Sequence, residues 1–446
     1  MNLRSGVIRI KRYVYFICAS TIVFIICISL YNFEVPKRTF LKKVRTTTET
    51  IADFRVKQAT AEIEEYDKHK YRIRVIREKI KRLTKTTNKQ FFIEPNVDIS
   101  NVSSKVHAFY YAWYKSIDYD GAWAHWNHKI LPNWNKNDLR TYPEGSHKPP
   151  EDIASNFYPL LGCYSSNDPF IIRTHMKYFK EAGLGVLVLS WAPPSYDDSP
   201  DSILQLMLDI ANEFNVKITL QVEPYKNRSP ENFMKYWKVF IDKYGSHSAL
   251  YKVKKSKSGT SLPLIYIYDS YIIDANEWKT IFSLGGPNTL RETKYDGIFL
   301  GLLVDVQHKV HIKRSEFDGF YTYFASNGFS YGSSWKNWNS LARFAKQNDL
   351  LFIPSVGPGY VDVKVRPWNS ANSKDRSHGR YYETAWRIAL KSGVSFVSIT
   401  SFNEWHEGTQ IEPAVYTSGY SSYDPEDSHF YLNLTRRFIK QMAFRN

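Results

Sequence analysis

Apolar residues recur in eight short runs along the chain, and segments of helical pattern separate most of these runs. The runs cover residues 106–112, 185–191, 216–225, 263–270, 296–304, 319–326, 350–357 and 394–405. Several are apolar at consecutive positions, which is typical of strands buried on both faces of a parallel sheet. Residues 169–182 and 202–214 instead place apolar residues at the spacing of an amphipathic helix.

Strands that alternate with helices predict a parallel sheet, and eight of them match the count of a (β/α)8 TIM barrel. A doubly wound open sheet is the alternative, but no G-x-G-x-x-G motif follows an early strand. We therefore predict an α/β fold in which residues 101–446 form a (β/α)8 barrel catalytic domain, preceded by a transmembrane helix and a charged stem.

The N-terminal region predicts a membrane anchor. Residues 13–33 form an uncharged run of 21 residues, long enough to cross the hydrocarbon core of a bilayer as a helix. A cleaved signal peptide is the alternative, although the run is longer than a signal core and no small-x-small cleavage site ends it. We expect residues 1–12 to be a cytoplasmic tail and residues 34–100, which are charged and nearly free of glycine, to be a stem.

Three N-glycosylation sequons, at Asn101, Asn227 and Asn433, fit a lumenal position for the main body. The formal net charge of +16 at first suggests nucleic-acid binding. However, residues 1–100 carry 21 Lys and Arg against 10 Asp and Glu, so most of the excess lies in the N-terminal region. No basic stripe marks the body, and we expect no nucleic-acid partner.

The carboxyl ends of the predicted strands share a chemical character, and active sites of (β/α)8 barrels lie at this end. The candidate substrate-binding residues there are Tyr110, Tyr111, Trp191, Glu223, Tyr225, Tyr323, Arg366, Asn403 and His406. Aromatic rings stack on the apolar faces of sugars, while amide and charged groups hold the hydroxyls. The sequence thus favours a carbohydrate site at the barrel mouth.

Glu404 and Glu407 are the candidate catalytic residues, because they follow the last strand directly and lie three positions apart. Glycoside cleavage typically needs two carboxyl groups, and neighbouring carboxyl groups have different pKa values, which separates acid from base. An exposed loop with two acids is the structural alternative.

A metal site is not implied. The segment 406–410 begins like the zinc motif H-E-x-x-H but has Gln410 in place of the second histidine, and it follows a strand. The three cysteines are too few for a disulfide framework, and Cys163 stands alone in the body. We expect no cofactor.

Several long motifs resemble glycoside hydrolase family 99 from about residue 106 to the C-terminus. They are FYYAWY, HWNH, YDSYI, FDGFYTYFASNGFSYGSS, FIPSVGPGY, RPWN and SFNEWHEGTQIEP. The resemblance implies a (β/α)8 barrel in a type II Golgi membrane enzyme. It also implies an endo-acting α-1,2-mannosidase that removes a glucosylated mannose from glucosylated high-mannose N-glycans with retention of configuration.

The resemblance also implies roles for individual residues. Glu407 is expected to be general acid and then general base, and Glu404 to deprotonate the substrate's own 2-hydroxyl, which gives a 1,2-anhydro sugar. Trp191, Glu223, Tyr225, Tyr323 and Arg366 are similar to sugar-contacting positions of the family. One departure is Ala192, where the family carries a larger aromatic residue. A lumenal lectin-like protein without turnover and a metallopeptidase are the competing hypotheses.

Overall fold

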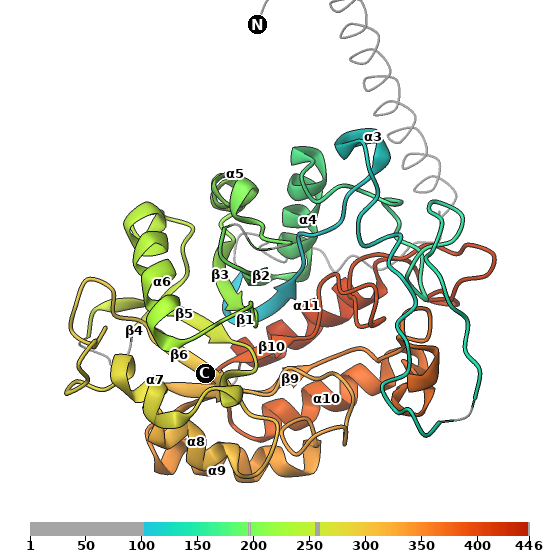
Figure 1. Cartoon of the computed structure of the whole chain (residues 1–446). Coiled ribbons are helices and arrows are strands. Elements are labelled where there is room, and N and C mark those ends of the chain that lie inside the picture. Colours follow the sequence, from blue (N-terminus) through green and yellow to red (C-terminus); the bar gives the residue numbers. More distant parts are fainter. Residues whose placement is uncertain (1–101, 139, 195, 197, 255–258, 445–446) are drawn as a thin grey trace, which may run out of the picture. The chain divides into compact units, whose positions relative to one another are not determined.

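Nine parallel strands form one ladder in the computed structural model, which describes residues 102–138, 140–194, 196, 198–254 and 259–444 (Figure 1). They are β1 (Ser103–Tyr110), β2 (Leu184–Trp191), β3 (Lys217–Val222), β5 (Ser261–Ile267), β6 (Ile298–Leu302), β7 (Gly319–Tyr321), β8 (Leu351–Ile353), β9 (Ser355–Val356) and β10 (Val397–Ile399). A short strand, β4 (Lys252–Lys254), pairs antiparallel with β5.

The ladder closes into a barrel of eight positions, because β8 and β9 occupy one position together. Only Pro354 separates them, and proline has no N–H group for the ladder. β8 pairs with β7, β9 pairs with β10, and β10 pairs with β1. The predicted (β/α)8 barrel is confirmed and the open sheet is excluded, since all eight predicted apolar runs contain strands of the ring.

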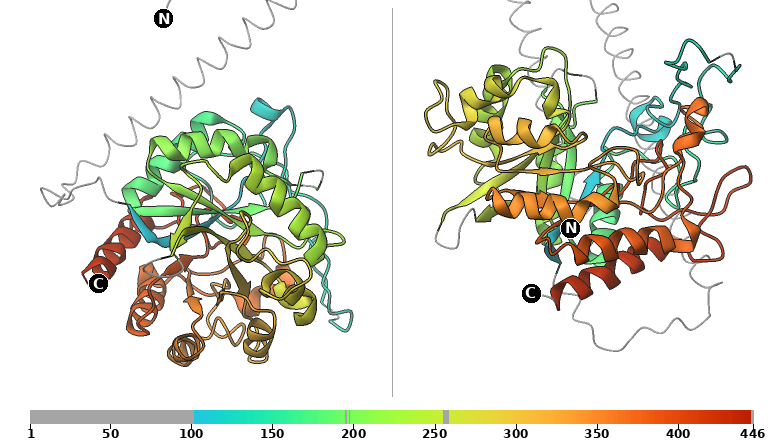
Figure 2. Two further views of the ribbon diagram at one scale, coloured as in Figure 1. Left: turned by 90° about the vertical axis from the view of Figure 1, so that its left-hand side faces the viewer. Right: turned by 90° about the horizontal axis from the view of Figure 1, so that it is seen from below.

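Helices surround the strands, as the view along the barrel shows (Figure 2, left). The main helices are α4 (Pro169–Ala182), α5 (Asp201–Glu213), α6 (Pro230–Tyr244), α7 (Ala275–Phe282), α8 (His308–Arg314), α9 (Trp338–Gln347), α10 (Arg380–Lys391) and α11 (Phe430–Ala443). Short helical turns are α3 (Ile117–Asp120), η1 (Ser270–Ile272), η2 (Trp335–Asn337), η3 (Pro367–Asn372) and η4 (Ser377–Gly379). Local sequence sets the ends of α4: the Asp168 side chain accepts from the Phe170 N–H, and Gly183 ends the helix with φ 76°.

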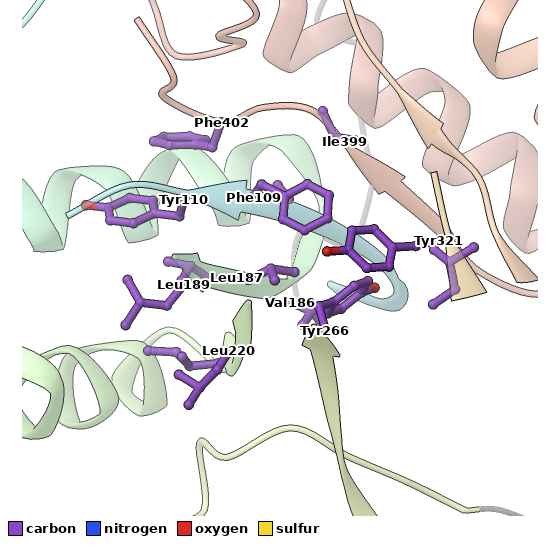
Figure 3. Packing of buried hydrophobic residues seen from close by; sticks show 14 of the residues in the cluster. Phe109, Tyr110, Val186, Leu187, Leu189, Leu220, Tyr266, Tyr321, Ile399 and Phe402 are labelled. Carbon is purple, nitrogen blue, oxygen red and sulfur yellow. The ribbon is translucent and has the colours of Figure 1, made fainter. Parts of the chain in front are cut away.

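Aromatic rings fill the interior of the barrel (Figure 3). Phe109, Tyr266 and Tyr321 come from β1, β5 and β7, with ring centroids 5.4 Å apart for the first pair and 4.9 Å for the second. Successive side chains of a strand point to opposite faces, so Tyr110 points outward and stacks on Phe402, 5.6 Å away. This alternation decides which residues at the strand ends reach the barrel mouth.

The predicted anchor and stem, residues 13–33 and 34–100, lie outside the described residues. None of the helices in the described part of the chain combines the length and apolar character that crossing a bilayer requires.

Candidate active site

Both predicted catalytic glutamates lie on one tightly braced segment, the acid loop (residues 400–412), which follows β10. The Ser401 N–H donates to the Thr409 carbonyl oxygen at 2.9 Å, and the two side-chain hydroxyls also lie 2.9 Å apart. Gly408 has φ +59°, and a Cβ there would lie 2.6 Å from a Val361 methyl carbon. The turn therefore requires glycine, and the loop has a defined conformation at the end of the strand.

A cavity of about 330 Å³ at the barrel mouth is lined by both acids, and its size is that of a small-molecule site. Its lining residues are Tyr111, Trp113, His125, His128, Gln221, Glu223, Tyr268, Tyr323, Val365, Arg366, Glu404, His406 and Glu407. Strand ends from all around the barrel thus contribute acids, an arginine, histidines and aromatic rings to one space.

Glu404 and Glu407 both hold a proton more tightly than a free glutamic acid. Burial raises the pKa of Glu407 to about 7, although the positive charge of Arg366 opposes this rise. Burial also raises the pKa of Glu404 well above its usual range, and the negative charge of Glu407 raises it further. Neighbouring carboxyl groups titrate as a pair. The pair therefore carries a proton near neutral pH, as acid–base catalysis requires.

His406 fixes the environment of Glu404. Its backbone N–H donates to Glu404 Oε1 at 3.0 Å, which favours the ionised carboxylate. Its ring Nε2 lies 2.9 Å from the carbonyl oxygen of His125, so Nε2 carries the proton and donates. Burial lowers the pKa of His406 well below its usual range. The ring is therefore neutral, and its Nδ1 lone pair lies 3.5 Å from Glu404 Oε1.

Glu223 and two tyrosines supply further polar groups. Glu223 accepts hydrogen bonds from the Ser190 hydroxyl at 2.9 Å and the Gln221 amide at 2.8 Å, while burial raises its pKa. The hydroxyls of Tyr111 and Tyr323 bond to each other, and burial raises the pKa of both well above the usual range. Both phenols are therefore neutral; one donates to the other, which leaves one O–H to donate to a ligand hydroxyl and oxygen lone pairs to accept from one.

The structure brings together Tyr111, Glu223, Tyr323, Arg366 and His406 of the predicted substrate-binding residues, but four others lie outside the cavity. Tyr110 is one of them, because the strand alternation turns it outward, where its hydroxyl lies 2.8 Å from His175 Nδ1. Asn403 is another, because its amide is used within the protein. It donates to the carbonyl oxygen of Tyr111 and accepts from the Tyr111 N–H, both at 2.8 Å.

Trp191 and Tyr225 are the other two predicted residues that do not line the cavity. Trp191 is buried against Phe240, with ring centroids 6.2 Å apart. The Tyr225 hydroxyl donates to Asn232 at 2.9 Å, and its ring packs beside Tyr196 at 4.9 Å. Both side chains therefore support neighbouring helices and loops rather than the cavity wall.

Six lining residues were absent from the predicted set. They are Trp113, His125, His128, Gln221, Tyr268 and Val365. Gln221 could have been predicted from the sequence. It lies two positions before Glu223 in an otherwise apolar run, so both side chains point to the same face at the end of β3. His125 had none, since its contact with His406 joins positions 281 residues apart.

A third buried acid, Glu412, lies at the end of the acid loop and has a complete set of donors. Its carboxylate accepts from Tyr164 Oη at 2.8 Å, from Trp405 Nε1 at 3.0 Å and from His175 Nε2 at 3.1 Å. By contrast, the Glu407 carboxylate has no hydrogen-bond partner among the described residues. Glu412 thus holds the indole between the two catalytic candidates, while Glu407 is free to bond to a ligand.

A larger cavity, of about 470 Å³, lies behind the acid loop and shares Gly408 with it, but neither catalytic candidate lines it. We assign the chemistry to the smaller cavity because only that one contains the acid pair. In the part of the chain that the structure describes, no cluster of three or more His, Cys, Asp or Glu side chains forms a possible metal site.

The chain is similar to proteins of known family. The model of glycosyl hydrolase family 99 matches residues 101–444. A glycoprotein endo-alpha-1,2-mannosidase of Mus musculus is 49% identical over 346 residues, which are 76% of this chain and 75% of that protein. A glycoprotein endo-alpha-1,2-mannosidase-like protein of Homo sapiens is 48% identical over 352 residues, covering 76% of this chain and 77% of that protein.

A solved structure is similar as well. The GH99 endo-alpha-mannosidase from Bacteroides thetaiotaomicron superposes with a TM-score of 0.72 and 41% sequence identity, covering 77% of this chain and 99% of that one.

Proposed function

The chain belongs to glycosyl hydrolase family 99 and is a glycoside hydrolase, and from this premise we propose that it is a retaining endo-α-1,2-mannosidase. Its proposed substrates are glucosylated high-mannose N-glycans on glycoproteins, from which it releases glucosyl-mannose oligosaccharides. The observation that carries the proposal is the pair of glutamates, Glu404 and Glu407, that line one cavity together with aromatic side chains. A binding protein has no need of such a pair, whereas glycoside cleavage uses one.

We assign the first step of the reaction to both glutamates. Glu404 takes the proton of the substrate 2-hydroxyl, and that oxygen attacks the anomeric carbon as Glu407 protonates the leaving oxygen. The axial 2-hydroxyl of an α-mannoside lies trans to the leaving group, so this attack comes from the opposite face. The His406 N–H favours the ionised form of Glu404 that a base requires, and it acts against burial and the charge of Glu407, which raise the pKa of that carboxyl group.

The second step opens the resulting 1,2-anhydro sugar. Glu407, now ionised, takes a proton from water as the water oxygen bonds to the anomeric carbon, and Glu404 returns its proton to O2. Two inversions give net retention. Glu407 suits the change from acid to base because its pKa of about 7 is close to neutral pH.

The remaining cavity residues are proposed to hold sugar hydroxyls and ring faces. Tyr111 and Tyr323 offer neutral phenols, Glu223 offers a carboxyl group, and Arg366 lies close enough to Glu407 to lower its pKa. His406 is better described as a positioning residue, because its ring N–H is already bonded to a carbonyl oxygen.

We also propose that the enzyme is a single-pass type II protein of the Golgi membrane, anchored by residues 13–33, with the barrel in the lumen. The uncharged run and the sequons support this proposal, and Asn227 and Asn433 are both exposed.

Product analysis tests the proposed function directly. Full-length protein in detergent is incubated with a defined glucosylated high-mannose glycan, and the products are separated by mass. Release of a disaccharide or longer fragment is expected. Binding of the glycan without any product would instead support a lectin-like protein.

A further inference from the structure

An exposed tryptophan lies beside the wall of the active-site cavity. Trp134 is 72% exposed, and among the exposed large apolar side chains of the described residues it is the only tryptophan. Single exposed apolar residues are common. An exposed indole, however, leaves a large apolar surface in contact with water instead of burying it in the core. Trp134 therefore requires a reason beyond folding.

The segment that carries Trp134 is bonded to the cavity wall. The Leu131 N–H donates to the Val365 carbonyl oxygen at 2.8 Å, and Val365 and Arg366 both line the cavity. Trp368 reinforces the connection, because its Nε1 donates to the Leu131 carbonyl oxygen at 3.0 Å. The ring of Trp134 rests against Trp368 with centroids 4.1 Å apart. The exposed indole is thus supported by a buried one.

The turn around Trp134 is itself ordered. Asn133 Nδ2 donates to Asp138 at 2.8 Å, and its Oδ1 accepts from the Asn135 N–H at 2.9 Å. These bonds fix the turn, so the indole presents a stacking surface of the kind that the apolar face of a sugar requires.

The position of Trp134 indicates which sugar it would meet. Under the proposed function, Glu407 protonates the leaving oxygen, and Arg366 lines the same cavity as Glu407. The rim that follows Arg366, including Trp368, therefore borders the leaving-group side. An endo-acting enzyme holds sugars on both sides of the bond, and a cavity of about 330 Å³ is at the small end of ligand pockets. Sugars of the leaving portion must then extend over this rim.

We propose that Trp134, supported by Trp368, is a stacking platform for a mannose residue of the leaving portion of the glycan, outside the main cavity. The inference rests on the proposed function. It predicts that Trp134 matters only for substrates with several sugars on the leaving side.

The test compares two substrates with full-length wild type and Trp134→Ala. On a glucosylated high-mannose glycan, kcat/KM should fall about three- to tenfold, mainly through KM, because stacking contributes modestly to binding. On a glucosyl-mannosyl fluoride, whose leaving group carries no sugar, kcat/KM should not change. Trp134→Phe should retain part of the lost activity on the glycan.

Phe444→Ala is the matched control, because Phe444 is 89% exposed and follows α11; it should leave both substrates unaffected. Equal losses of Trp134→Ala on both substrates, or no loss on either, would overturn the inference. Failure of wild type to cleave either substrate would instead refute the proposed function.

Discussion

The acid loop contains two kinds of glutamate within nine positions, and they differ in what surrounds their carboxyl groups. Glu412 is fully buried and accepts three hydrogen bonds, from an indole, a phenol and an imidazole. Glu407 faces the cavity with no hydrogen-bond donor among the described residues, and burial raises its pKa to about 7. The satisfied carboxyl group stabilises the loop, whereas the unsatisfied one is available to a substrate.

Burial of an acid therefore does not by itself indicate a catalytic residue. A buried carboxylate with enough donors is a structural element, and its removal leaves those donors unpaired. A buried carboxyl group without donors costs stability in the folded protein, and such costs are characteristic of active sites. The two glutamates should therefore respond oppositely to substitution.

Glu407→Gln should have the largest effect on turnover. General acid–base catalysis typically contributes about 10²–10⁴-fold, so kcat for a glucosylated high-mannose glycan should fall by at least about that factor. The thermal midpoint should stay the same or rise, because the amide cannot carry the negative charge that burial disfavours. Kinetics and thermal unfolding on the same preparation check both statements. A lowered midpoint would mean that Glu407, like Glu412, stabilises the fold.

Glu412→Leu should have the largest effect on stability. The change removes the acceptor of Tyr164 and His175, while Trp405 Nε1 keeps only its longer bond of 3.2 Å to Tyr164 Oη, and each unsatisfied buried group costs about 1–3 kcal/mol. We expect the free energy of unfolding to fall by at least about 2 kcal/mol in urea titrations. A loss under about 1 kcal/mol would mean that the hydrogen-bond network is not needed to hold the loop.

The stability of the protein should depend on pH through Glu407. Burial raises the pKa of Glu407 from 4.5 to about 7, so its protonated form stabilises the fold fully below pH 4.5, and this contribution is lost as the pH rises through 7. Relative to Glu407→Gln, wild type should lose about 1–3 kcal/mol of stability over that window. Urea titrations of both proteins at several pH values give the difference in their free energies of unfolding. A difference that does not vary with pH would contradict the raised pKa of Glu407.

The same titration predicts the alkaline limb of activity. Hydrolysis of a natural glycan requires protonated Glu407, so kcat/KM should decline as the pH rises through about 7. A pH–rate profile of wild type tests this, and activity that continues to rise above pH 8 would argue against Glu407 as the acid.

The smallest effects should distinguish two adjacent tyrosines. Tyr110→Phe removes a hydrogen bond to His175 outside the cavity, so stability should fall by about 1 kcal/mol with unchanged kinetics. Tyr111→Phe also removes one hydrogen bond, to Tyr323, but this hydroxyl lies in the cavity, so KM should rise as well. Kinetics and unfolding measured on both variants test this difference. A rise in KM for Tyr110→Phe but not for Tyr111→Phe would mean that Tyr110, not Tyr111, faces the cavity.

The fold was largely predictable because all eight strand positions of the barrel fall in mainly apolar runs, several of them apolar at consecutive positions. The break at Pro354 and the short strand β4 were not predicted, since neither alters the apolar pattern of its segment. The acid pair was predictable from its place after the last strand. Tyr110 was misplaced because FYYAWY is aromatic at nearly every position, so the sequence does not indicate which rings point inward.

The supporting network was hidden from the sequence for a different reason. Glu412 lies only five positions beyond Glu407, but its role depends on His175 in α4, which is 237 residues away. Likewise, the tautomer of His406 depends on the carbonyl group of His125. Such long-range contacts leave no local pattern that periodicity or motif spacing would reveal.

In the proposed mechanism, Glu407 supplies the proton to the leaving group while Glu404 acts on the substrate itself. The most direct test is the hydrolysis of a mannosyl fluoride substrate, whose leaving group departs without protonation, by Glu407→Gln and Glu404→Gln. We expect Glu407→Gln to retain much of the wild-type rate on this substrate, and Glu404→Gln to lose it. Equal losses in the two variants would contradict this mechanism.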